Sequence, residues 1–520
     1  MNPDKRFILH TKPPLAAGSS GTLRFTYRPQ TPLPPGARLW LMYDIRQGAG
    51  APQGRDSLSP NYVSASAGSG TDAVCDGYGA RTLDLYPTLP EFLHVCEIAL
   101  PQGMAQDDAL AIALGAGQGA WAFPKHPIDP FRFWLVEGGE GQRFEPTGYK
   151  TYRDFGPPHD LQDASDWLLA ADAAFEGPAP RLSAENRRPT PGILWGDIHG
   201  MAFNQRPLGD FYEYAREVSG FDFAAAMLFS YNVCVGDMWA EVKQAAARAT
   251  RAGEFVGIAG VEFGTPPDSS HRNAHFFNAE GVPPIFFEDR PPALDPRFTA
   301  RLHPETVFCR DLDHFYATVR AYGGIVSGHF HTLRYDREIL AELWQKQAGS
   351  AGEEGRIFGL LNRGMRLGLV GGSDTHDSMP GNPEPEPGCP QAAGLMAVLA
   401  DQADPERIRQ AVLDRRVYAT TGARIALGVD AEGRPMGSVM PHAAPRVFQV
   451  RAEGAARLKA VELIRRGAIV DGVEPSHGYW EGSLRGCDEG DESDAEWYVV
   501  RVTQEDGHRA WSSPIWFEDI

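Results

Sequence analysis

Four apolar runs in the middle of the chain each end in residues that can bind a metal ion. These residues are Asp197 and His199, then Glu262, then His329 and His331, then Asp374 and His376. His271 and His275 follow shortly after Glu262. Imidazole and carboxylate together suit Zn, Mn or Fe. Such an ion polarises a scissile bond and lowers the pKa of water, so the pattern predicts metal-dependent hydrolysis.

Each of these residues also has a structural interpretation. A single histidine beside a strand is more often a packed side chain than a ligand, and Asp374 could cap the helix that follows it. Glu262 is harder to explain in this way, because it closes a strand too apolar for a surface edge and a buried carboxylate needs a partner. His329 and His331 share a strand face if the extended backbone continues. The combination favours a metal site.

Alternating strands and helices must position these residues. Buried strands are expected at 221–229, 254–262, 324–327 and 366–371, and helices at 210–218, 239–251, 314–322 and 405–415. Such alternation is typical of parallel β/α units, in which the carboxyl ends of the strands meet at one face. The number of units in 191–425 favours a barrel over a small open sheet. The fold class expected is therefore α/β.

The segments before and after 191–425 have other residue patterns. Residues 1–125 contain short alternating runs separated by Pro, Gly and Ser, which favour a β-sandwich-like domain. Residues 126–190 are rich in proline and charge before Ile193 and are expected to be a linker. Residues 426–520 return to strand texture and predict a small C-terminal β domain. The Pro- and Gly-rich run 377–390 directly follows His376 and is expected to form a loop that selects substrate.

Composition narrows the range of partners. The net charge of −19 is unlike the basic face of a nucleic-acid binder, so no nucleic-acid partner is expected. No window reaches the about 18 apolar residues that a membrane helix needs, and the N-terminus has no signal-peptide pattern. The six cysteines lack CxxC spacing, which fits reduced thiols. A cytoplasmic protein with a small-molecule substrate is expected, and its oligomeric state stays open.

Several longer motifs carry a family resemblance over residues 190–520. They are Trp195-Gly196-Asp197-Ile198-His199, Gly260-Val261-Glu262-Phe263, His271-Arg272-Asn273-Ala274-His275, Gly372-Ser373-Asp374-Thr375-His376, the run 416–425 and the tail 510–516. Together they resemble the polymerase and histidinol phosphatase (PHP) superfamily, and more closely its bacterial branch of uncharacterised PHP-like proteins. The resemblance implies a distorted β/α barrel with up to three metal ions.

Position by position, the resemblance implies a ligand set. His199, Glu262 and Asp374 match ligands of a first metal. Glu262 would bridge to a second metal that His275 and His329 also hold. His376 matches a ligand of a third metal.

The sequence departs from the family pattern at two motifs. The family's first motif is His-x-His, whereas here His199 is followed by Gly200 and Met201. A Thr-Asp-His motif is replaced by a run that contains Ser230, Tyr231 and Asn232. We therefore expect one or two divalent ions (Zn, Mn or Fe) rather than three. Asp197, His331 or Tyr231 could join the ligand shell in a new way.

Three functional hypotheses follow. The first is metal-dependent hydrolysis of a small molecule at a phosphoester, amide, ester or ether bond, with His331 or His376 as proton donor. Tyr231 could donate a proton or a hydrogen bond to an oxyanion, and Arg272 and Arg334 could orient an anionic group. The second is lyase or isomerase chemistry with the metal as Lewis acid. The third is a non-catalytic metal- or ligand-binding protein with a partly lost site.

Overall fold

The computed structural model of residues 1–520 divides into two compact units. The first comprises Met1–Pro180, with Phe203–Pro207 and Ala293–Phe298, and the second comprises Arg181–Ala202, Leu208–Pro292 and Thr299–Ile520. The structure describes residues 6–10, 15–44, 49–67, 73–84, 90–106, 108–124, 128–138, 168–176, 190–202, 208–265, 270–287, 302–328, 338–346, 350–382, 391–442, 444–486 and 496–519.

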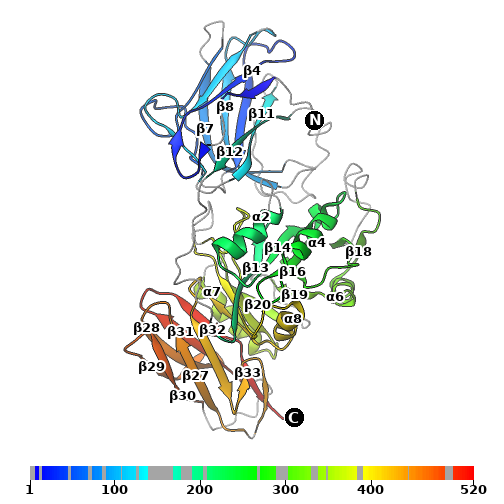
Figure 1. Cartoon of the computed structure of the whole chain (residues 1–520), viewed down its shortest axis with the longest axis vertical. Helices are drawn as coiled ribbons and strands as arrows, with labels where there is room; N and C mark the ends of the chain where they lie inside the picture. The colour runs from blue at the N-terminus through cyan, green and yellow to red at the C-terminus, as the bar shows by residue number, and fades with distance from the viewer. Residues whose placement is uncertain are drawn as a thin grey trace. The chain divides into compact units, whose positions relative to one another are not determined.

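The first unit is built from β-strands (Figure 1). They are β1 (Phe7–Leu9), β2 (Leu15–Ala16), β3 (Ser20–Gly21), β4 (Leu23–Tyr27), β5 (Ala37–Asp44), β6 (Val63–Ala67), β7 (Val74–Asp84), β8 (Pro90–Leu100), β9 (Leu110–Leu114), β10 (Trp121–Ala122), β11 (Ile128–Gly138) and β12 (Leu168–Glu176). One sheet has the order β1-β4-β9-β6, a second has the order β2-β12-β11-β5-β8-β7, and β10 pairs with β3.

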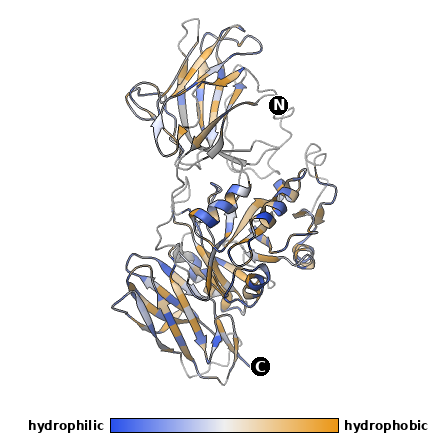
Figure 2. Cartoon of the chain, in the orientation of Figure 1, coloured by the Kyte–Doolittle hydropathy of each residue, from blue (hydrophilic) through white to orange (hydrophobic). Residues whose placement is uncertain are grey.

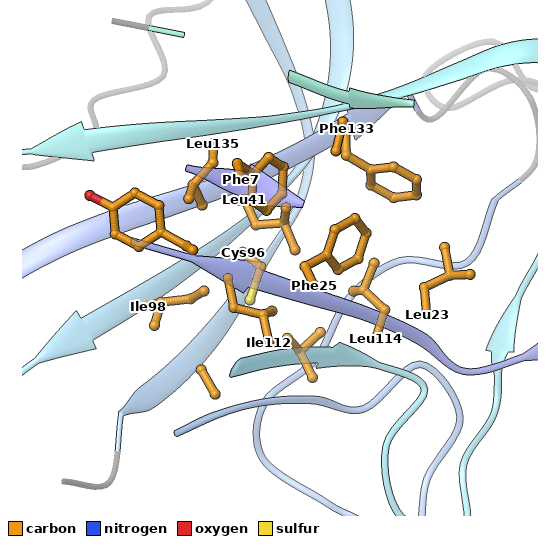
Figure 3. Close-up of a cluster of buried hydrophobic side chains, with 14 of the residues drawn as sticks. Phe7, Leu23, Phe25, Leu41, Cys96, Ile98, Ile112, Leu114, Phe133 and Leu135 are labelled. Atoms are coloured by element: carbon orange, nitrogen blue, oxygen red, sulfur yellow. The ribbon is translucent and has the colours of Figure 1, made fainter. Parts of the chain in front are cut away.

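Side chains from both larger sheets form one apolar core, as a β-sandwich requires. Figure 3 shows Phe7, Phe25 and Leu114 from the four-stranded sheet beside Leu41 and Phe133 from the six-stranded sheet. The Phe7 and Phe25 rings are stacked with their centroids 5.2 Å apart.

Part of the segment expected to be a linker belongs to this unit. β11 and β12 lie within 126–190 and pair with each other across the six-stranded sheet, so the linker expectation was wrong for these residues. Their period-two alternation buries Phe131, Phe133 and Leu135 from β11 and Ala173 and Phe175 from β12. The proline and charge elsewhere in the segment obscured this alternation.

The second unit contains both strands and helices. Its strands up to residue 420 are β13 (Ile193–Met201), β14 (Phe223–Phe229), β15 (Val256–Thr265), β16 (Ser270–Phe276), β17 (Ile285–Phe287), β18 (Val307–Cys309), β19 (Ile325–Gly328), β20 (Leu340–Trp344), β21 (Gly368–Gly371), β22 (Leu395–Leu399) and β23 (Val417–Thr420). Its helices are α2 (Leu208–Glu213), the π-helix η2 (Tyr214–Val218), α3 (Ser230–Val233), α4 (Met238–Ala249), α6 (Leu312–Ala321), α7 (Ser350–Leu361) and α8 (Pro405–Leu413).

The central sheet is a mixed half-barrel. Its strands follow the order β21-β20-β19-β16-β15-β14-β13-β22-β23 and continue into the C-terminal strands. The β13, β14 and β15 strands are parallel, as are β19, β20 and β21. β16, however, runs antiparallel to both neighbours, and β22 runs antiparallel to β13 and β23. The expectation of uniformly parallel β/α units was therefore wrong. The short connection from β15 to β16 leaves no room for a crossover helix, so the chain turns back on itself.

Local sequence explains these elements. β14 is the apolar run Phe-Ala-Ala-Ala-Met-Leu-Phe, and Figure 2 colours the chain by hydropathy. All seven residues of β14 are buried. Helix α6 begins where the Asp311 carboxylate accepts a hydrogen bond from the His314 backbone N–H at 2.7 Å. Helix α8 begins with Asp404 as N-cap and Pro405 in its first turn.

The C-terminal residues extend the same sheet. Their strands are β24 (Ala426–Ala431), β25 (Arg434–Pro435), β26 (Val439–Pro441), β27 (Val447–Glu453), β28 (Leu458–Arg465), β29 (Ala468–Val473), β30 (Tyr479–Arg485), β31 (Glu496–Gln504), β32 (Arg509–Ser512) and β33 (Ile515–Glu518). β32 pairs with β23, and β24, β25, β27 and β30 form a separate sheet. Trp497 and Trp511 pack with Ile357 and Phe358 of α7 in one core, so part of residues 426–520 shares its core with residues of the preceding region.

Two further findings concern the described residues of both units. None of the helices in the described residues has the length and apolar character needed to cross a membrane. Cys75, Cys96, Cys234 and Cys309 are buried free thiols.

Candidate metal centre

Asp197, in the middle of β13, holds this strand to the loop after β21. Its Oδ1 accepts hydrogen bonds from the backbone N–H groups of His199 and Ser373, both at 3.0 Å, and its Oδ2 accepts one from Gly381 at 3.1 Å. Burial raises the pKa of this carboxyl, although the hydrogen bonds oppose the shift. The side chain expected as a ligand therefore has both oxygens engaged by backbone amides.

His199 lies between three carboxylates and is fully buried. Its Nδ1–H donates to Glu342, with the two carboxylate oxygens at 3.0 and 3.1 Å. On the other side of the ring, Nε2 lies 3.8 Å from Glu262 Oε2 and 3.4 Å from Asp374 Oδ1. Burial alone would lower the pKa of His199, but the charges of Glu342 and Asp374 raise it well above its usual value.

Glu262 connects His199 with His271. The Nδ1–H of His271 donates to Glu262 Oε1 at 2.6 Å. Burial alone would raise the pKa of Glu262, but His271 and His199 hold it well below its usual range. The His271 side chain is 24% exposed and the Glu262 side chain is 3% exposed. His271 therefore connects the buried Glu262 carboxylate with the protein surface.

His275 lies deeper on the same strand as His271. Its Nε2 is 2.8 Å from the Ser327 hydroxyl, and its Nδ1 is buried without a hydrogen-bond partner among the described residues. Burial, with a smaller contribution from His199, lowers the pKa of His275 to about 3. The imidazole is therefore neutral at pH 7, which is the form that binds metals.

Asp374 and His376 follow β21 in a tightly held loop. The Asp374 backbone N–H donates to the His199 carbonyl at 2.6 Å, and Asp374 has a φ of 46°, in the left-handed region. A non-glycine residue held in this region is uncommon and often marks a functional site. His376 Nδ1–H donates to the Asp374 carbonyl at 3.0 Å. Burial raises the pKa of the Asp374 carboxyl, which His199 and His376 partly oppose.

Three residues at the centre lie outside the set that the sequence predicts. Glu342 interrupts the apolar strand β20 with a buried carboxylate, and this interruption was the available signal. Lys346 and Gln345 follow β20 and are both fully buried. The Lys346 ammonium lies 3.5 Å from the Thr375 hydroxyl, on the loop between Asp374 and His376.

Gly372 makes the approach of these side chains possible. A Cβ atom at this position would overlap the Glu342 carboxylate and approach His199 Cβ within 2.6 Å. Glycine is therefore required where the loop passes between β13 and β20.

The structure places Arg272 away from the centre. Neighbouring residues of a strand point to opposite faces, so Arg272 lies on the face opposite His271. It forms a buried ion pair with Glu338, at 3.1 Å from Nε to Oε1, and the Tyr316 hydroxyl donates to the same oxygen at 3.0 Å. This placement argues against the catalytic role expected for Arg272. His329, His331, Arg334 and the side chain of Tyr231 lie outside the described residues, as does 383–390 of the expected substrate loop.

The spacing of the donor atoms can be compared with the bond lengths of the metal ions that the sequence predicts. Bonds of about 2.0–2.2 Å around a tetrahedral ion place its ligand atoms about 3.3–3.6 Å apart. His199 Nε2 and Asp374 Oδ1, at 3.4 Å, match this spacing, and Glu262 Oε2 lies slightly farther away. No group of three or more such side chains among the described residues is arranged to hold an ion as it stands. The donor chemistry and pairwise spacing fit a divalent ion, although the set is not complete in the described part of the chain.

Comparisons with known proteins give distant relatives. No protein-family model matches the chain. An uncharacterised protein of Chlamydia muridarum is 28% identical over 184 residues, which cover 32% of this chain and 30% of that protein. An uncharacterised protein of Chlamydia pneumoniae is 22% identical over 368 residues, which cover 63% of this chain and 58% of that protein. The matches thus span between about a third and three-fifths of these relatives.

One solved structure is similar to a limited extent. It is a two-domain protein from Bacteroides vulgatus described as containing a predicted PHP-like metal-dependent phosphoesterase. It shares 12% identity, covers 65% of this chain and 100% of its own length, and has a TM-score of 0.34. At this TM-score the likeness does not establish a common fold.

Proposed function

We propose that the chain is a metal-dependent hydrolase of a small-molecule substrate. The observation that carries the proposal is the position of His199, whose Nε2 faces Glu262 and Asp374 while its Nδ1 is held by Glu342. Metal-binding histidines commonly donate their second N–H to a carboxylate, which fixes the tautomer and the ring orientation. Several buried carboxylates that lie together require positive charge, and a metal ion would add to what the buried Lys346 and the His199 and His271 imidazoles supply.

The ions would be held by His199, Glu262 and Asp374, with His275, His376 and His329 as further ligands. We propose one or two divalent ions, with Zn, Mn and Fe as the candidates. A divalent ion in such a centre acts as a Lewis acid, which polarises the bond to be cleaved and promotes the ionisation of water. The proposal covers hydrolysis of a phosphoester, amide, ester or ether bond.

Residues of the chain supply the remaining requirements. Glu342 keeps the proton of His199 on Nδ1, which leaves Nε2 directed at the carboxylates. Asp197 fixes the relative positions of β13 and the Ser373 loop through backbone N–H groups. His271 reaches the surface while bonded to Glu262, so it can exchange protons with solvent. In a centre where His376 binds no ion, its Nε2 is the described candidate for proton transfer to the leaving group, because its Nδ1–H is held by a carbonyl.

Elemental analysis of the purified protein tests this proposal. The parent should retain one or two divalent ions per chain after dialysis, and Glu262→Gln and Asp374→Asn should lose them. Glu254→Gln, which removes an exposed carboxylate just before β15, should keep the parent's metal content. Hydrolysis of a panel of phosphoesters, esters, amides and ethers should appear with metal and disappear with chelator.

Two results would contradict the proposal. A parent that holds no ion and takes none up on incubation would exclude the metal centre. Retained metal with no hydrolysis of any bond class would favour a non-catalytic metal-binding protein instead.

A further inference from the structure

Glu262 belongs to a row of oxygen-bearing side chains that crosses three strands. Glu262 on β15 is directly opposite Asn273 on β16, and Asn273 is directly opposite Ser327 on β19. Residues directly opposite in an antiparallel pair share a face, with Cβ atoms about 4.5–5.5 Å apart. Asn273 and Ser327 are therefore on the face where Glu262 meets His199 and His271.

The Asn273 amide lacks the hydrogen bond that its burial would require. Asn273 is 1% exposed, and its Oδ1 is buried with no hydrogen-bond partner among the described residues. A buried carbonyl oxygen without a donor costs about 1–3 kcal/mol, so such an atom in a folded protein calls for an explanation. If Asn273 Oδ1 bound nothing, an apolar side chain of similar size would be more favourable at this position, because it would not carry that cost.

His275 presents a second unsatisfied atom two residues along the same strand face. Its Nε2 is 2.8 Å from the Ser327 hydroxyl, and its Nδ1 is buried with no hydrogen-bond partner among the described residues. One carboxylate, one amide oxygen and one imidazole nitrogen thus lie on adjacent positions of β15 and β16. Metal ions satisfy lone pairs of this kind together, without needing a hydrogen-bond donor.

We propose that the Asn273 side-chain carbonyl is an oxygen ligand of a divalent cation held with Glu262 and His275. This assignment rests on the proposed metal centre and adds to it a neutral oxygen donor that selects the metal. Amide and carboxylate oxygens suit Mn²⁺, whereas Zn²⁺ favours imidazole and thiolate in smaller ligand sets. Asn273 therefore biases this position of the centre towards Mn²⁺.

Mn²⁺ binding by the full chain tests the assignment. Free Mn²⁺ is followed by electron paramagnetic resonance in a titration of the parent, Asn273→Ala, His275→Ala and the double variant. Asn273→Ala should weaken the binding of one Mn²⁺ per chain at least about tenfold, with a smaller loss for Zn²⁺ in a chelator competition. The double variant should lose less than the sum of the two single losses, because both side chains serve one ion.

Two companion variants make the result specific. Asn273→Asp keeps an oxygen donor and should bind Mn²⁺ at least as well as the parent, which also covers the case in which the alanine variant does not fold. Asn278→Ala removes an exposed asparagine whose Oδ1 only accepts the Glu280 N–H, and it should bind Mn²⁺ as the parent does. Unfolding midpoints in EDTA report whether each metal-free variant is folded.

The outcomes separate this assignment from the proposed function. If the parent binds Mn²⁺ and folded Asn273→Ala binds it within twofold of the parent, the assignment is wrong while the metal centre stands. Weakened binding in Asn273→Asp would also contradict it. If the parent binds no divalent ion at all, the metal centre and the assignment fail together.

Discussion

The Glu342 carboxylate lies 3.0 Å from His199 Nδ1, on the opposite side of the imidazole from Asp374. A carboxylate in this position determines which nitrogen of the ring carries the proton. It comes from β20, a strand that contributes no residue to the predicted ligand set. The two residues are 143 positions apart in the chain.

Replacement of Glu342 by glutamine should therefore weaken metal binding without unfolding the protein. The amide keeps the size of the side chain but loses the charge that favours a proton on Nδ1. We expect a loss in metal affinity of about 10–100-fold, the range observed when the partner of a metal-bound histidine is changed. Competition with a chromophoric chelator measures the affinity, and the exposed Glu254→Gln variant is the control. Equal affinity in the two variants would show that Glu342 does not orient His199.

A methyl group at Gly372 should also disturb the contact between Glu342 and His199. The added Cβ would overlap the Glu342 carboxylate, so Gly372→Ala should cost about 1–3 kcal/mol in the free energy of unfolding and lower metal affinity. Gly355 lies exposed in α7 with open space around its Cα, and Gly355→Ala should stabilise the protein by about 0.5–1 kcal/mol. Urea unfolding of both variants measures these opposite signs. A neutral Gly372→Ala would mean that the loop can move away from β20.

Arg272 and Glu338 should behave as a structural pair. Arg272→Met leaves the Glu338 charge buried, and we expect a loss of about 3–5 kcal/mol in the free energy of unfolding. The double variant Arg272→Met with Glu338→Leu should recover much of this loss, because two apolar side chains replace the buried charges. Its metal affinity should match that of the parent. A folded double variant that retained metal but lost all hydrolysis would instead support the role in orienting an anionic group that the sequence suggests for Arg272.

A buried ion pair in the C-terminal strands should make stability depend on acid pH. Burial alone would raise the pKa of Glu496, but hydrogen bonds from Arg446 and Tyr498 lower it below its usual value of 4.5. Arg446 Nη2 lies 2.6 Å from Glu496 Oε2. The folded pKa is lower than the unfolded one, so Glu496 contributes its full stabilisation above pH 4.5 and loses it as the pH falls through the folded value.

Urea unfolding between pH 3 and pH 7 measures this contribution. The parent should lose stability below about pH 4.5, and Glu496→Gln should show a smaller slope in that range while being less stable at pH 7. A variant with the same acid slope as the parent would show that other carboxyl groups account for the pH dependence.

The sequence pointed to site residues where a side chain able to bind a metal ion follows an apolar run. Asp197, His199, Glu262 and Asp374 stand out because polar residues follow apolar strands, and the structure places them together. Glu342 was missed because its partner is distant in the chain, and only the three-dimensional register reveals the contact. β16 was not expected as a strand at all, because Ser270–Phe276 is a largely polar run without the apolar stretch that indicates a buried strand, so its antiparallel pairing with β15 and β19 was missed as well. Arg272 was assigned from its place in a motif, although its neighbours on the strand point the other way.

The pairing of β23 with β32 has a consequence for synthesis of the chain. Tyr418, Ala419 and Thr420 are hydrogen-bonded neighbours of Ser512, Trp511 and Ala510, which leave the ribosome about ninety residues later. Until then the edge of β23 that pairs with β32 is exposed. The apolar face of α7 that packs against Trp497 and Trp511 is exposed as well. We therefore expect the second unit to complete its folding only after β31 and β32 have been synthesised. A translation product that stops before these strands would contain every candidate ligand and would still be prone to aggregate.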